Sequence, residues 1–66
     1  MKTRLTAVLI KEDDMYVASN PDTGVTTQGG SMDEALANLR EAVGLYLEET
    51  KEKLPAREVV LASVEV

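Results

Sequence analysis

The sequence contains no cysteine, no histidine, no tryptophan and no phenylalanine. Without cysteine the chain has no disulfide and no thiolate zinc site. Without histidine it lacks the commonest general base and the commonest transition-metal ligand. We therefore expect a protein that is not an enzyme and that needs no cofactor and no metal.

The carboxylate residues do not indicate a catalytic metal site that would work without histidine and cysteine. A metal-dependent nuclease needs several of them converging on Mg²⁺. Asp13 and Asp14 are neighbours in a predicted turn, and the last predicted strand carries only Glu58 and Glu65. We interpret these residues as solvated acids rather than metal ligands.

Basic residues are also few, with seven Lys and Arg against twelve Asp and Glu, for a formal net charge of −5. They are scattered rather than clustered, so we expect no direct nucleic-acid binding. An acidic surface suits a basic partner. No apolar run approaches the roughly 20 residues that span a bilayer, and the N-terminus has no signal-peptide pattern. The expected location is the cytoplasm, away from membranes.

A chain of 66 residues is expected to form one domain, residues 1–66. A domain of this size buries only about 60% of its unfolded surface. Because disulfides and metals are not there to supplement the core, association with another chain is the expected supplement.

Apolar periodicity predicts four strands and one helix. The strands are expected at residues 3–11, 15–19, 25–28 and 58–66. The helix is expected to begin after Ser31, run for about 20 residues and end before Pro55. The order β-β-β-α-β predicts an α+β fold with the helix on one face of the sheet. With the last strand beside the first, the sheet order is 3-2-1-4.

The turn before the third strand is dense in turn-forming residues. Pro21 fixes its own φ, Asp22 can cap the turn, and Gly24 supplies a positive φ.

The helix start is similarly specified. Gly29 and Gly30 let the chain reverse into the helix. Ser31 and Glu34 fit a capping box, in which each side chain bonds a backbone N–H of the other's turn.

The first and last predicted strands carry apolar residues on both faces, whereas one helix covers only one face. The uncovered face is expected to be an interface. The candidate interface residues are Val8, Ile10, Val59 and Leu61.

Residues 16–18, 20–29 and 31–49 resemble the HicB-type antitoxin family. The resemblance rests on the P-D-T-G turn, the T-Q-G strand end and the helix segment S-M-D-E-A-L-A-N-L-R-E-A-V-G-L-Y-L. It implies a truncated ribonuclease-H-like fold and a role in neutralising a small basic mRNA-cleaving ribonuclease, the HicA-type toxin. Many members carry a further C-terminal DNA-binding domain, and this chain resembles the short form without it.

Three residues are candidates for binding such a partner. Tyr16 either contacts the partner or packs on the sheet; Gln28 either bonds a partner backbone or merely ends its strand; Asp22 either pairs with a basic partner or caps its turn. The alternative function is a structural or regulatory homo-oligomer, a homodimer or larger, with no toxin.

Overall fold

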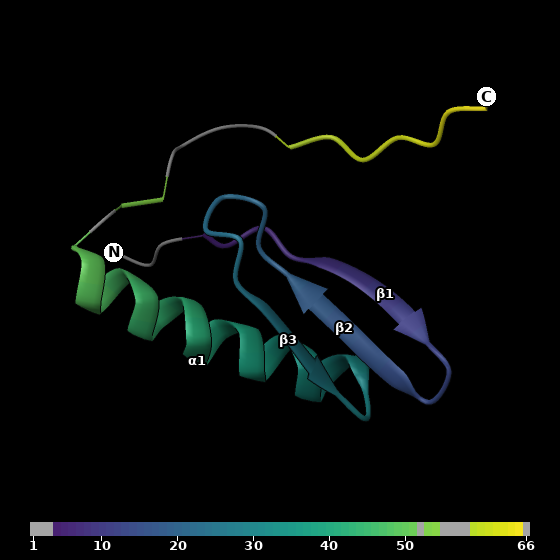
Figure 1. Cartoon of the computed structure of the whole chain (residues 1–66), viewed down its shortest axis with the longest axis horizontal. Helices are drawn as coiled ribbons and strands as arrows, with labels where there is room; N and C mark the ends of the chain where they lie inside the picture. The colour runs from purple at the N-terminus through teal and green to yellow at the C-terminus, as the bar shows by residue number, and fades with distance from the viewer. Residues whose placement is uncertain (1–3, 52, 55–58, 66) are drawn as a thin grey trace.

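The computed structural model describes residues 4–51, 53–54 and 59–65 of the chain. It contains strands β1 (Val8–Glu12), β2 (Met15–Ser19) and β3 (Thr26–Gly29), followed by helix α1 (Met32–Thr50). Figure 1 shows the strands as one sheet, with α1 lying across one side of it. Three antiparallel strands followed by one helix confirm the predicted α+β class.

The sheet has the order β1-β2-β3, and both strand pairs are antiparallel. The β1–β2 hairpin closes at the pair Glu12–Met15, so its loop is the two residues Asp13 and Asp14. Asp13 has a φ of 54°, a conformation that Asp tolerates better than most residues. The first strand begins at Val8, later than predicted, and residues 4–7 belong to no strand.

The hydrophobic core lies between the sheet and α1. Its fully buried members are Ala18 from β2 and three helical residues, Ala35, Leu39 and Val43. The helical residues are spaced four apart, the period that keeps side chains on one face of a helix. Half-buried apolar residues surround this cluster: Leu5, Ala7, Leu9, Tyr16, Val25, Leu47 and Leu54.

The predicted final strand is wrong for residues 59–65, which form no strand; Glu58 and Val66 lie outside the described residues. The predicted order 3-2-1-4 therefore holds only for its first three strands. Alternating apolar residues give a segment the propensity for a strand, but a strand also needs a neighbouring backbone to pair with. In Figure 1 the C-terminal segment runs apart from β1.

The helix begins at the predicted cap. Ser31 has extended backbone angles, and its Oγ accepts a hydrogen bond from the N–H of Glu34 at 3.1 Å. This is one half of the predicted capping box. The helix ends at Thr50, before the predicted limit at Pro55, which lies outside the described residues. Lys51 ends it in the left-handed conformation, with a φ of 61°.

The turn before β3 is organised by Asn20, a residue that the sequence reasoning left without a role. Its Oδ1 accepts from the N–H of Thr23 at 2.9 Å and from the Thr23 hydroxyl at 2.8 Å. Asn20 therefore provides a side-chain cap for this turn. Gly24 has the predicted positive φ, 78°, and its N–H donates to the Asn20 carbonyl. Pro21 is exposed within the turn.

Gly29 has a different role from the predicted one. A Cβ atom at this position would lie 2.6 Å from the Ala35 nitrogen and 3.0 Å from the Glu34 carbonyl carbon. Both are backbone atoms that cannot move aside cheaply. Gly29 is therefore required because the end of β3 packs directly on the first turn of α1.

Candidate protein-binding surface

The face of the sheet that α1 does not cover carries an apolar surface. Ala18 is buried against the helix, so its cross-strand partner Leu9 shares that side. Side chains alternate along a strand, which places the flanking residues on the opposite side. We call this side the outer sheet face; its apolar residues are Val8, Ile10, Met15 and Val17.

These residues form a contiguous patch. Ile10 lies directly across from Val17, and Met15 lies across from Glu12. Ile10 is 52% exposed and Met15 is 38% exposed. Val8 and Ile10, two of the predicted interface residues, therefore both lie on the outer sheet face. The patch could bury apolar area against another protein.

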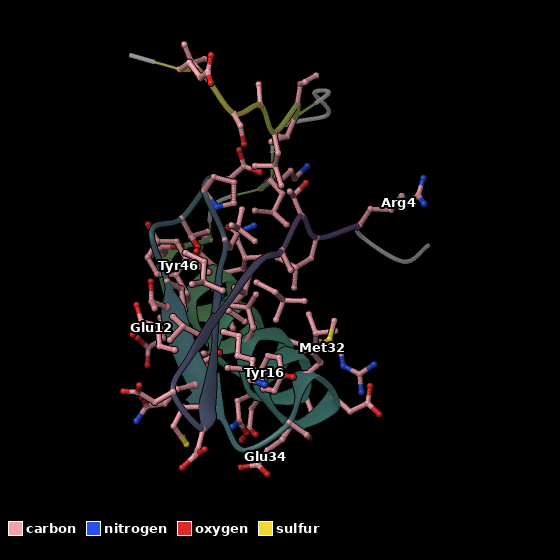
Figure 2. All side chains as sticks on the ribbon, turned by 90° about the vertical axis from the view of Figure 1, so that its right-hand side faces the viewer. Arg4, Glu12, Tyr16, Met32, Glu34 and Tyr46 are labelled. Atoms are coloured by element: carbon pink, nitrogen blue, oxygen red, sulfur yellow. The ribbon has the colours of Figure 1, made fainter. Side chains whose placement is uncertain are left out.

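The hairpin end of this patch is acidic. Glu12 belongs to the outer sheet face, and Asp13 and Asp14 form the adjoining loop; all three are exposed. Figure 2 shows Glu12 and Tyr16 pointing to opposite sides of the hairpin. An apolar patch with carboxylates at one end is complementary to a partner with basic groups beside an apolar area.

The three predicted partner-binding residues are not brought together. Tyr16 is on the helix side of the sheet, half-buried against the core, with the Lys11 Nζ 5.8 Å from its ring centroid. Gln28 is exposed and lies across from Val17, on the outer sheet face. Asp22 is half-buried in the turn. Of the three, only Gln28 adjoins the patch.

The other two predicted interface residues lie off the sheet. Val59 is half-buried and Leu61 is 71% exposed, both in the C-terminal segment. We predicted that they share a face with Val8 and Ile10, because we expected residues 58–66 to form a fourth strand in the same sheet.

A second apolar surface is a groove between residues 5–7 and the helix, with a volume of about 580 Å³. Most of its lining residues are apolar, among them Leu5, Ala7, Leu36, Val43 and Leu47, while Asp33 and Arg40 add a carboxylate and a guanidinium to its wall. The small residues on the helix, Ala37 and Gly44, were a signal for it in the sequence. They leave room beside the helix that larger side chains would fill.

Within the part of the chain that the structure describes, no three carboxylates lie close enough to hold a metal ion. Asp13 and Asp14 occupy the hairpin loop, without a third acid converging on them. Nor does any described helix have the length and apolar character needed to cross a bilayer.

Comparison with known proteins gives a family without an assigned activity. No curated protein matches the chain, and no solved structure matches it. The HicB-type resemblance and the ribonuclease-H-like fold that it implies stay predictions. One family model, described as a family of unknown function (DUF7387), matches residues 4–64. Because this match covers nearly the whole chain, the protein belongs to that family.

Proposed function

We propose that this domain is a protein-binding module that works by covering a partner's surface. The observation that supports the proposal is the outer sheet face, where Ile10 and Met15 are exposed beside Val8 and Val17 while α1 covers only the other side. Exposed apolar side chains gathered on one sheet face are typical of an interaction site. The absence of histidine and cysteine leaves binding as the simpler use of that face.

The proposed partner is a small basic ribonuclease that cleaves mRNA, as the HicB-type resemblance implies. The net charge of −5 would speed the encounter with a basic protein by electrostatic steering. The acids at the hairpin end would meet basic groups on the ribonuclease. Covering those groups would block RNA, since RNA binding depends on the same positive charge. We expect the module to act in the cytoplasm.

The experiment is co-expression with the small basic protein encoded by a neighbouring reading frame, followed by purification and titration. We expect a complex at micromolar concentration that weakens as salt rises, since exposed charges are screened. A lack of binding at that concentration would overturn the antitoxin role.

A matched pair of variants locates the interface. Ile10 on β1 and Leu45 on α1 are 52% and 54% exposed, so a charge at either position disturbs the fold similarly. Ile10→Glu should weaken binding by about tenfold or more, because burying a carboxylate in an apolar contact costs at least about 1.4 kcal/mol. Leu45→Glu should leave binding unchanged. Equal effects of the two variants would contradict the assignment of the outer sheet face.

The alternative function is a structural or regulatory homo-oligomer without a toxin. The observation that favours it is the exposed C-terminal segment, where Val60 is 74% exposed and Val64 is 81% exposed. A genomic neighbourhood without a small basic reading frame would favour this alternative.

A further inference from the structure

The C-terminal segment 59–65 has the sequence of a strand but no strand partner in the structure. It reads V-V-L-A-S-V-E and carries one charged residue. Val60, Leu61 and Val64 are each more than two-thirds exposed. Figures 1 and 2 both show it apart from the sheet and helix. An extended apolar segment that leaves the body of a domain is the kind of element that two copies exchange.

The molecule as a whole is more open than its length requires. Its radius of gyration is 12.8 Å, whereas a compact domain of this length has about 11 Å.

The two edges of the sheet differ in how they are covered. At the β3 edge, Asn38 Nδ2 from the helix donates to the Gln28 carbonyl at 2.9 Å, and the Thr27 hydroxyl donates to the Ala35 carbonyl at 3.1 Å. These bonds tie β3 to α1. At the other edge, β1 pairs with β2 only, as far as the described residues extend. The β1 edge is thus the one available to a further strand.

The apolar groove adjoins that same region. Leu5 and Ala7, in the chain leading into β1, form one wall, and α1 forms the other with Val43, Gly44 and Leu47. A strand added beside β1 and its leading residues would place every second side chain over this groove. The open edge would supply backbone hydrogen bonds, and the groove would receive apolar side chains.

We propose that residues 59–65 of one copy add to the β1 edge of a second copy and fill its groove, in a reciprocal exchange that forms a dimer. Each copy carries both halves of the contact, the segment and the edge with its groove, so the exchange closes with two-fold symmetry. Val60, Ala62 and Val64 face the groove, because this set is wholly apolar, whereas the alternate set includes Ser63 and Glu65. The dimer is independent of the proposed ribonuclease partner.

The first test is the mass of the full chain in solution by light scattering. We expect twice the chain mass of 7.2 kDa, about 14 kDa, at micromolar concentration. Raising salt should strengthen this dimer, since it screens the repulsion between two chains of net charge −5. Binding to a basic ribonuclease should respond in the opposite direction, so the two proposals fail separately. A chain that stays at 7.2 kDa would overturn the exchange.

Matched variants identify the contact. Val64→Glu should dissociate the dimer at least tenfold more readily. Ser63→Glu, which adds the same charge to the other side of the segment, should change the dissociation constant by less than half as much on a logarithmic scale. Gly44→Arg should also dissociate the dimer, because its side chain enters the groove, while a Cβ at position 44 meets no atom within 4 Å in the single chain. Equal dissociation by Ser63→Glu would contradict the assigned face.

Cross-linking distinguishes exchange from docking of the segment onto its own chain. Because the chain has no native cysteine, single cysteines can be placed by Thr6→Cys in one sample and Leu61→Cys in another, both on the side that faces away from the groove. With a short bis-maleimide, the mixed samples should give a covalent dimer on a denaturing gel. A chain carrying both substitutions that cross-links only to itself, at high dilution and at micromolar concentration alike, would overturn the proposal.

Discussion

Asn20 Nδ2 donates a hydrogen bond of 2.8 Å to the carbonyl of Thr6, fourteen residues earlier in the chain. Asn20 is fully buried, and its Oδ1 accepts two bonds from Thr23. One side chain therefore holds the turn before β3 and also joins that turn to the residues leading into β1. The bond positions one wall of the groove, because Thr6 lies between the groove residues Leu5 and Ala7.

Replacing Asn20 by Ala should lower the free energy of unfolding by about 2–3 kcal/mol. The change removes three hydrogen bonds and leaves the Thr6 carbonyl and the Thr23 N–H without their partner. Urea unfolding followed by circular dichroism measures the effect. Thr23→Val is the control, since it keeps the backbone bond to Asn20 and should cost about 1 kcal/mol. An Asn20→Ala protein as stable as the parent would contradict this role.

Replacing Gly29 by Ala should destabilise the domain by about 1–3 kcal/mol, because the new Cβ would overlap the backbone of Glu34 and Ala35. Gly44→Ala should do the opposite and stabilise by about 0.5–1 kcal/mol, since it lies in an exposed part of the helix with open space beside it. Thermal unfolding of both variants compares them directly. The prediction fails if both substitutions stabilise the protein.

Replacing Lys51 by Gly should stabilise the domain by about 0.5–1 kcal/mol. Lys51 ends the helix with a φ of 61°, and its N–H donates to the Leu47 carbonyl. Gly adopts this left-handed conformation without the steric cost that a side chain imposes. Lys51→Ala keeps the steric cost and serves as the control in the same urea experiment. A loss of stability on substitution by Gly would show that the side chain of Lys51 matters more than its backbone.

Replacing Ser31 by Ala should cost about 1 kcal/mol, because the N–H of Glu34 loses its cap. Ser31→Asp keeps an oxygen acceptor and adds a charge that suits the helix N-terminus, so it should match the parent or exceed it. Hydrogen exchange at the amide of Glu34 reports the cap itself. Unchanged exchange in Ser31→Ala would rule out the bond.

Much of the fold could be predicted from interactions between residues that are close in the sequence. Ser31 identified the start of the helix, since a cap involves groups three residues apart. Gly24 identified a left-handed position, since only backbone sterics decide it. The alternation through Val8 and Ile10 separated the two faces of β1 before any partner strand was known. These features depend on neighbours in the chain, so they could be predicted.

Contacts between distant parts of the chain decided the rest. Asn20 tethers its turn only because the β1–β2 hairpin brings Thr6 beside it, and Gly29 is required only because α1 packs on the end of β3. The segment 59–65 has the propensity of a strand, yet it forms none in the structure because no neighbouring backbone pairs with it. The sequence by itself determined which elements could form. The tertiary structure decided which of them found partners, because backbone pairing and close packing join residues far apart in the chain.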